Sequence, residues 1–287
     1  MIDTFNTHRP LLFGIAYRML GQVAEADDIM QEVWLRWQRQ DIATVLSAKA
    51  WLVAATTRLC IDQLRSARRA REEYYGIWLP EPLMPATETD GGTTTELADS
   101  LRMAFMLMLE SLGPVERAVF LLREVFSYDY PEIALIVGKS EANCRQIVRR
   151  ARLQLDAAPK PSTPPTDRAQ QLVEAFLAAT AGGDVQGVLS LLSENSTVYS
   201  DGGGRVKAAG RPIIGADHVS RFLLGIWPRF GATMLQRTVD INGSPGIVLS
   251  EGGRIHYAFS FEVIADRIHA IYIICNPDKL RHLTPSR

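Results

Sequence analysis

Basic and amide side chains recur along one short segment of the chain in an arrangement that could read DNA. The pattern over residues 127–155 predicts a helix, a tight turn through Gly138, and a second helix that begins after Ser140. Apolar residues such as Cys144 and Ile147 recur at helical spacing on the second helix, which leaves basic and amide groups outside. Such groups can bond guanine and adenine edges and hold phosphates. The segment is interpreted as a helix-turn-helix, although an ordinary helix pair with a solvated basic face has the same pattern.

The first block of the chain carries two charge clusters of opposite sign. Acidic residues gather between positions 25 and 32, beside Trp34 and Trp37, and arginines between positions 58 and 71 follow Trp51. An acidic ridge flanked by exposed tryptophan suits a protein partner. Cations near an aromatic ring suit phosphates and unstacked bases. For each cluster the alternative is an amphipathic helix with a solvated outer face.

Composition excludes several classes of protein. The chain has 287 residues with 31 Lys plus Arg against 32 Asp plus Glu, so any affinity for DNA must be local. Its apolar content of 47% is ordinary for globular domains, and its length indicates two or three of them. Cys60, Cys144 and Cys275 are widely spaced, which indicates buried thiols rather than disulfides or metal ligands. No apolar run approaches about 18 residues, so we expect a cytoplasmic protein without a membrane partner.

Proline-rich stretches divide the sequence into blocks. A helical bundle is predicted for residues 1–75 and a second helical block for 96–158. They are joined by a linker at 76–95, and a stiff tether at 159–166 leads to a third domain at 167–287. The linker includes an apolar Trp-Leu-Pro-Glu-Pro strip, which indicates that it docks on another part of the protein.

The third domain has the pattern of an α+β cone, in which a curved antiparallel sheet wraps around helices and leaves a cavity at its open end. The predicted helices lie around 172–179, 188–192 and 219–226, and the predicted strands at 197–199, 234–241, 246–250, 255–263 and 267–275.

The cavity of such a cone could bind a small molecule or carry acid–base chemistry. The available groups are Tyr199, Asp201, His218, His256 and Tyr257. Nothing in the sequence sets a base beside an orienting partner. The chain is therefore interpreted as a non-enzyme with no catalytic residue, cofactor or metal site, and binding of an unknown small-molecule ligand is left open.

Three runs of sequence resemble the bacterial extracytoplasmic-function sigma factors of RNA polymerase. They are EADDIMQEVWLRW at 25–37, WLVAATTRLCIDQLR at 51–65, and the segment SLGPVERAVFLLREVFSYDYPEIALIVGKSEANCRQIVRRARLQL at 111–155. The resemblance implies an all-α sigma region 2 at the front and an all-α, helix-turn-helix sigma region 4 behind it. Its implied partners are core RNA polymerase, through the clamp helices of the largest subunit and the flap, and promoter DNA.

The resemblance also implies roles for individual residues. Polymerase contacts would be Asp28, Gln31, Glu32 and Trp34. Contacts to the −10 promoter element would be Trp51, Thr57, Arg58, Asp62, Arg65 and Arg68. Contacts to the −35 element would be Lys139, Ser140, Glu141, Asn143, Arg145, Gln146, Arg149 and Arg150.

The third domain resembles the SnoaL-like, cystatin-like fold that one subgroup of these sigma factors carries at the C-terminus. Three motifs support this, and the resemblance implies that they regulate the sigma domains in cis. The first is Trp78, Leu79, Pro80, Glu81 and Pro82; the second is Asp201, Gly202, Gly203 and Gly204; the third is Asn276, Pro277, Asp278, Lys279 and Leu280. Glycines allow a close backbone approach, and two prolines make a strip with little entropy to lose on docking.

The predicted function is promoter-specific transcription initiation with core RNA polymerase, regulated by the fused domain. The alternative is a helix-turn-helix regulator with a ligand-sensing C-terminal domain that does not join polymerase. The acidic residues near position 28 distinguish the two, because only the first function needs them for a polymerase contact.

Overall fold

A computed structural model describes residues 1–72, 74–84, 99–155, 166–229 and 233–283, without the side chains at 42, 67–72 and 166. These residues form two compact units. The first comprises Met1–Glu72 with Phe105–Pro159, and the second Glu73–Ala104 with Lys160–Arg287. No helix in the described part of the chain is long and apolar enough to cross a membrane.

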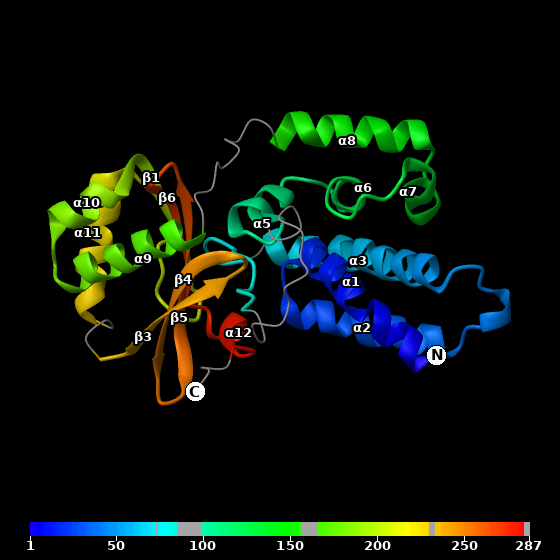
Figure 1. The fold of residues 1–287 in the computed structure, drawn as a ribbon, viewed down its shortest axis with the longest axis horizontal. Coiled ribbons are helices and arrows are strands. Elements are labelled where there is room, and N and C mark those ends of the chain that lie inside the picture. The colour runs from blue at the N-terminus through cyan, green and yellow to red at the C-terminus, as the bar shows by residue number, and fades with distance from the viewer. Residues whose placement is uncertain (73, 85–98, 156–165, 230–232, 284–287) are drawn as a thin grey trace. The chain divides into compact units, whose positions relative to one another are not determined.

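The first unit begins with a helical bundle of α1 (Ile2–Leu20), α2 (Val23–Gln38) and α3 (Ala48–Glu72), with the short 3-10 helix η1 (Ile42–Thr44) before α3 (Figure 1). Gly21 ends α1 in the left-handed conformation and donates to the carbonyl of Tyr17, as a C-terminal glycine cap does. The predicted apolar stripe of α1 is confirmed, since Leu12 and Met19 are fully buried.

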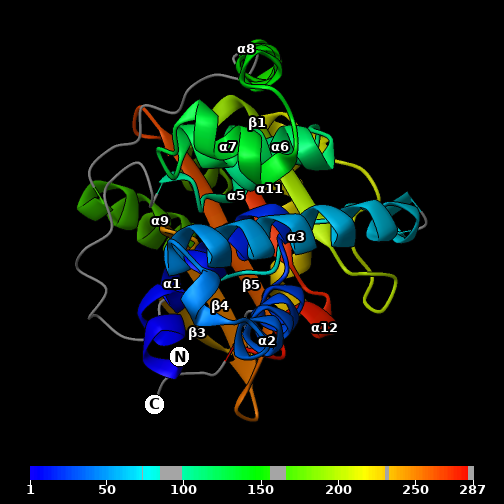
Figure 2. The same ribbon diagram turned by 90° about the vertical axis from the view of Figure 1, so that its right-hand side faces the viewer.

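The helices of the second helical block lie in the same unit, apart from Met103 and Ala104 at the start of the first of them. They are α5 (Met103–Leu109), α6 (Pro114–Glu124), α7 (Tyr130–Val137) and α8 (Glu141–Leu155). α6 and α7 pack against α3, and Figure 2 shows α3 running past both. The blocks predicted at 1–75 and 96–158 are therefore packed together rather than free of each other.

The second unit contains the predicted cone. Its strands are β1 (Leu192–Asp201), β2 (Ile213–Ile214), β3 (Leu235–Ile241), β4 (Ser244–Glu251), β5 (Arg254–Ile264) and β6 (Arg267–Ile274), in the order β2-β1-β6-β5-β4-β3. The helices are α9 (Thr166–Ala181), α10 (Val185–Leu191), α11 (Ala216–Ile226) with η2 (Trp227–Arg229), and the short α12 (Pro277–Leu280). The five predicted strands are confirmed, whereas β2 has no counterpart in the prediction. One pair, β1 with β6, is parallel, so the sheet is mixed rather than wholly antiparallel.

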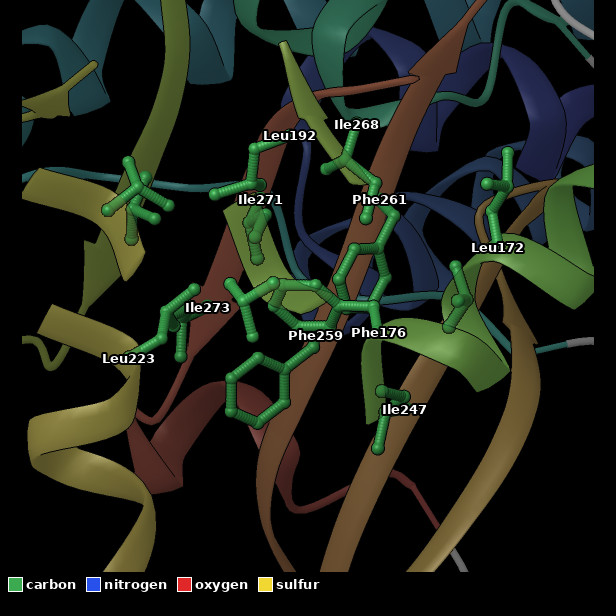
Figure 3. Close-up of a cluster of buried hydrophobic side chains, with 14 of the residues drawn as sticks. Leu172, Phe176, Leu192, Leu223, Ile247, Phe259, Phe261, Ile268, Ile271 and Ile273 are labelled. Carbon is green, nitrogen blue, oxygen red and sulfur yellow. The ribbon is translucent and has the colours of Figure 1, made fainter. Parts of the chain in front are cut away.

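The core of the cone lies between the sheet and the helices α9 to α11. Alternate residues of β5, including Phe259 and Phe261, point toward Phe176 of α9 and Leu223 of α11 (Figure 3). Phe176 meets Phe261 edge-on with ring centroids 5.4 Å apart. Aromatic side chains thus form much of the core between the sheet and these helices.

Phe259→Ala should destabilise the second unit by about 3–5 kcal/mol, because it removes a side chain that is 1% exposed and leaves a cavity. Urea unfolding followed by circular dichroism measures the loss. Val185→Ala, at an exposed position of α10, is the matched control and should change stability by less than about 0.5 kcal/mol. Equal effects of the two changes would contradict the packing described.

Candidate functional site

The three motifs that lie outside the predicted DNA-binding helices meet at one place in the second unit. Residues 78–82 of the linker, the loop that follows β1, and α12 converge on the carboxylate of Asp201. Tyr74 joins them from the start of the linker. We call this cluster the linker clamp, and it consists of Tyr74 and residues 78–82, 201–204 and 276–280.

Asp201 is the centre of the linker clamp. It is fully buried at the end of β1, and its carboxylate accepts four hydrogen bonds. Oδ1 accepts from the Tyr74 hydroxyl at 2.5 Å and the Gly203 amide at 3.0 Å. Oδ2 accepts from the Leu79 amide at 2.8 Å and the Lys279 ammonium at 2.7 Å. Burial first, and the neighbouring Asp201 carboxylate second, raise the pKa of Tyr74 above its ordinary value, so the phenol remains a neutral donor.

Lys279 balances the charge of Asp201 and binds the linker directly. Its ammonium group donates to the carbonyl of Leu79 as well as to Asp201. It also lies over the rings of Trp78 and Tyr74, 4.3 and 5.0 Å from the ring centroids. The ion pair is almost completely removed from water, with Lys279 only 4% exposed. Loss of either partner would leave an uncompensated buried charge, which costs about 3–5 kcal/mol.

Backbone geometry explains the glycine and asparagine of the motifs. Gly203 has φ 57°, and a Cβ there would overlap the side chain of Asn276. Asn276 caps α12 by accepting from the Asp278 amide at 3.0 Å, and its own amide donates to the Tyr74 hydroxyl at 3.0 Å. A larger residue at position 203 would therefore separate the β1 loop from α12.

A second anchor holds the linker at the turn between β3 and β4. Asn242 and Leu83 exchange hydrogen bonds of 2.8 Å in both directions. The Asn242 side-chain amide also donates to the carbonyl of Leu101 at 3.0 Å. Asn242 and Gly243 both have positive φ, as a tight Asn-Gly hairpin requires. The Asn-Gly pair in the sequence predicts this turn but not its contact with the linker. A hairpin turn is by itself a sufficient reason for an asparagine at this position, so nothing in the sequence points to a second role.

His282, which the sequence analysis did not single out, extends the clamp toward Pro82. Its Nε2 atom lies 2.8 Å from the Pro82 carbonyl, and its Nδ1 atom lies 3.9 Å from the buried carboxylate of Glu81. The proline strip is thus bound to other residues of the second unit along its length.

The helix-turn-helix is present as predicted. Gly138 ends α7 in the left-handed conformation, and the Ser140 hydroxyl accepts from the Asn143 amide at 3.2 Å to cap α8. Cys144 and Ile147 are buried in the predicted inner face. The predicted −35 contacts are exposed on α8 and the turn before it, apart from the half-buried Glu141, which pairs with Arg145 at 2.8 Å.

Aromatic and acidic neighbours hold the arginines of α8. Arg145 and Arg123 both lie over the ring of Tyr130, at 5.0 and 4.9 Å. Arg152 makes two hydrogen bonds to Glu124, at 3.0 and 2.8 Å. Tyr130 also lines a shallow hollow with Arg145, Val148, Arg149, Arg152 and Leu153. The hollow is cationic and open, so it could hold a phosphate or carboxylate group.

The predicted polymerase contacts lie on one helix, α2, but its tryptophans are less exposed than predicted. Asp28, Gln31 and Glu32 are exposed on α2, and Glu32 pairs with Arg36 at 2.7 Å. Trp34 is half-buried and packs on the ring of Phe5. The prediction that Trp37 is exposed was wrong, because it is 1% exposed and packs on Trp51 in the bundle core.

The predicted −10 contacts lie along α3. Asp62 and Arg65 are exposed and pair with each other at 3.3 Å, and Arg58 is exposed. Trp51 is half-buried, and Thr57 is fully buried, so its surface is closed to DNA in this arrangement. Arg68 lies within α3, but its side chain is outside the described part of the chain.

The candidate acid–base groups of the cone lie at separate places. Asp201 is held in the linker clamp, Tyr199 stacks on Tyr272, and His218 lies beside the carbonyl of Ile214. His256 and Tyr257 line a cavity of about 110 Å³, together with Cys275 and Pro277 among others.

Two family models match the chain in the order that the structure shows. Sigma-70 region 2 matches residues 4–70, and Sigma-70 region 4 matches residues 102–155. The first span covers nearly all of α1 to α3, and the second contains the helix-turn-helix. The class of protein is therefore a sigma factor with both promoter-reading regions.

Relatives over the full length define the family further. The chain is 36% identical to the ECF RNA polymerase sigma factor SigJ of Mycobacterium tuberculosis over 292 residues, covering 97% of this chain and 92% of the relative. The probable ECF RNA polymerase sigma factor SigI of the same species is 28% identical, covering 96% and 93%. The crystal structure of M. tuberculosis SigJ matches with a TM-score of 0.79 and 33% identity over 98% of both chains. The protein belongs to the ECF RNA polymerase sigma factor family, with a C-terminal α+β domain fused to the sigma regions.

Lys279→Met should destabilise the second unit by about 3–5 kcal/mol, since a similar volume is kept while Asp201 loses its counter-charge. Urea unfolding of the full chain measures this, and Lys207→Met at an exposed lysine is the matched control. The double variant Asp201→Asn/Lys279→Met should lose less than the sum of the single losses. Additive losses would show that the pair is not coupled.

Proposed function

We propose that this chain is the sigma subunit that brings core RNA polymerase to promoters and that its C-terminal domain regulates it through the linker clamp. The observation that carries the proposal is the joint presence of region 2, region 4 and the full-length likeness to ECF sigma factors. Sigma factors act with RNA polymerase, so the proposal places the protein where transcription occurs, in the cytoplasm.

The polymerase contact is assigned to α2. Asp28, Gln31 and Glu32 form an exposed strip, and Trp34 adds a half-buried apolar surface beside it. Acidic side chains with an adjacent ring suit a basic protein surface, such as the clamp helices of the largest polymerase subunit. The flap of polymerase is the proposed partner of region 4.

The promoter contacts are assigned to α3 and α8. The exposed Asn143, Arg145 and Gln146 offer side chains that can bond base edges, and Arg149 and Arg150 offer phosphate contacts. The Ser140-capped start of α8 also offers backbone amides to an anion. On α3, Arg58 and Arg65 supply cations for the −10 element.

Regulation is assigned to the linker clamp. The linker joins region 2 to region 4, and two separate anchors, Asp201 with Lys279 and Asn242, tie it to the cone. When a linker joins two DNA-binding regions, binding of one raises the effective concentration of the other at the DNA. This gain requires a linker that lets the two regions reach both promoter elements at once. Holding or releasing the linker therefore controls joint promoter binding. The 110 Å³ cavity beside α12 is the proposed place for a small ligand to act on the clamp.

Asp28→Arg/Glu32→Arg should abolish co-purification of the chain with core RNA polymerase, because it reverses the charge of the α2 strip. Affinity capture of tagged protein with purified core enzyme measures this. The double variant Asp167→Arg/Glu174→Arg makes the same charge change on exposed residues of α9 and should leave capture unchanged. Undiminished capture of the α2 variant would favour the alternative function, a regulator that binds DNA without joining polymerase.

Asn242→Gly should raise promoter-dependent RNA synthesis with core polymerase several-fold, because it removes the side-chain hydrogen bonds to the Leu83 amide and the Leu101 carbonyl and leaves only the backbone bond to Leu83. Glycine accepts the φ of 57° at this position, so the hairpin itself is kept. Run-off transcription at equal concentrations of wild-type and variant chain measures the effect. Asn195→Gly, at an exposed position of β1, is the control. Equal transcript yields from wild type and Asn242→Gly would remove the regulatory part of the proposal.

A further inference from the structure

Tyr75 is the exposed neighbour of a tyrosine that belongs to the linker clamp. The Tyr74 hydroxyl donates to Asp201 and accepts from the Asn276 side-chain amide, which fixes the chain at this position. The next residue, Tyr75, is 80% exposed. A ring whose backbone is already held loses little entropy when a partner stacks on it. Tyr75 therefore has the properties of a preformed stacking surface.

The Tyr75 side chain lies against the glycine loop that follows β1. A Cβ atom added to Gly204 would lie 3.4 Å from the Tyr75 Cβ atom and 3.7 Å from atoms of its ring. Gly204 has a φ of 70°, so a side chain there would also be strained. The contact with Tyr75 gives the third glycine of the motif a role beyond the clamp, because it brings the ring and the loop backbone together.

The loop between β1 and β2 is rich in cations. Its exposed cations are Arg205, Lys207 and Arg211. Residues 202–216 contain no acid. The Arg205 Nε atom lies 3.5 Å from a carboxylate oxygen of Asp278, and such an exposed pair contributes little. Asp278 also pairs with the exposed Arg281, so two cations share one negative charge. The surface next to Tyr75 is therefore net positive.

Hydrogen bonds within the loop hold its backbone in shape. The amides of Arg205 and Val206 both donate to the Gly202 carbonyl, at 2.9 and 3.1 Å. Further along, the Ala209 amide donates to the Ser200 hydroxyl at 2.8 Å. The cations thus project from a loop of defined conformation rather than from a loose tail.

An exposed ring beside cations is the chemistry that binds a single nucleic-acid strand, whose bases stack on the ring while its phosphates meet the cations. The bases of a duplex are already stacked on one another, and an acidic protein needs only the cations. Tyr75 also follows Glu72, the last residue of α3, by three positions, and α3 is the helix assigned to the −10 element. Covalent connection alone therefore keeps Tyr75 near the end of that helix.

We infer that Tyr75 and the β1–β2 loop form a binding surface for single-stranded DNA, on which Tyr75 stacks an unpaired base while Arg205 and Lys207 hold phosphates of the same strand. This inference rests on the proposed function and deepens it, because opening of the promoter supplies the single strand. The C-terminal domain then makes a DNA contact of its own. Docking of the linker completes that contact, since it places Tyr75 beside Gly204.

Tyr75→Ala in the full chain should weaken binding of a short fluorescein-labelled oligothymidine about fivefold or more, because one stacked base loses its platform. Fluorescence anisotropy measures the Kd. Tyr75→Phe keeps the ring and is the matched control, which should bind as wild type does. An unchanged Kd of folded Tyr75→Ala overturns the inference, as do equal losses in the two variants.

A cross-linking experiment reads the same contact at the residue itself and is independent of DNA bound elsewhere on the chain. An oligothymidine that carries one 5-iodouracil base reacts under ultraviolet light with an aromatic ring stacked on that base. Mass spectrometry of the digested wild-type chain should place a cross-link on Tyr75. Cross-links that spare Tyr75 when the chain is saturated with the oligonucleotide overturn the inference.

Arg205→Gln/Lys207→Gln should lower the slope of log Kd against log salt concentration by about 1.4, since each cation that neutralises a phosphate of a single strand contributes about 0.7. Anisotropy titrations at several salt concentrations measure the slope. Arg221→Gln/Arg229→Gln removes two exposed cations from α11 and η2 and should leave the slope unchanged. The loop is not a phosphate site if its variant keeps the wild-type slope or if the control loses as much.

Two competitors test the kind of partner. A duplex of the same length should lose less affinity than the single strand when Tyr75 is replaced by alanine, and an equal loss overturns the stacking role. Oligoglutamate at the same concentration of charge should displace the oligonucleotide poorly. Equal displacement would show that the surface recognises charge alone and fits an acidic protein, which also overturns the inference.

The outcomes separate this surface from the proposed function, because the oligonucleotide assays need no polymerase. If Tyr75 cross-links as expected but the wild-type chain forms no transcript with core polymerase, the proposed function fails and the DNA surface stands. If the wild-type chain supports transcription while Tyr75 neither cross-links nor affects the Kd, the DNA surface fails and the proposed function stands.

Discussion

The second unit depends on one buried ion pair, between Asp201 and Lys279. A carboxylate and an ammonium withdrawn from water are stable together only when their remaining hydrogen-bonding groups are satisfied. Here the segment around the linker supplies several of these hydrogen-bond partners. The Leu79 amide and the Tyr74 hydroxyl donate to Asp201, and the Leu79 carbonyl accepts from Lys279. The pair therefore needs the linker as much as the linker needs the pair, which makes docking of residues 74–83 a cooperative event.

Polar contacts hold the linker to the cone and also hold the two sigma regions together. The linker is held by hydrogen bonds to Asp201, Lys279 and Asn242, and the two sigma regions are joined by Arg58 and Arg117 through backbone carbonyls. Such bonds have strict geometry, yet each contributes only modestly to stability because water competes for the same groups. A protein built in this way has contacts of defined geometry and modest individual strength.

Local sequence patterns correctly predicted the elements whose formation depends on residues close together in the sequence. The helix-turn-helix followed from Ser140, Gly138 and the apolar spacing of α8, and each has the role expected of it. The cone followed from strand periodicity. The short β2 and the parallel pairing of β1 with β6 could not be predicted in this way, since pairing partners are chosen by tertiary packing.

The contacts of individual residues were harder to predict. The three motifs of the linker clamp were recognised, but their meeting around one carboxylate depends on residues separated by about 120 to 200 positions in sequence. Trp37 was expected as an exposed neighbour of the acidic residues, whereas the helical period turns it into the bundle. Tyr74 and Asn242 carry no signal that distinguishes them from a linker tyrosine and an ordinary turn. Predicted contacts to DNA and polymerase remain predictions.

Asn242 also sets how far the chain can stretch. The same side chain and its backbone bind Leu83 and Leu101, so these two positions are held at one turn of the cone although they lie far apart in sequence. An extended chain covers at most about 3.3–3.6 Å per residue, so without these bonds the two positions could lie up to roughly 55–60 Å apart. One asparagine therefore restrains the distance between two distant positions of the chain, and losing its side chain would relax that restraint.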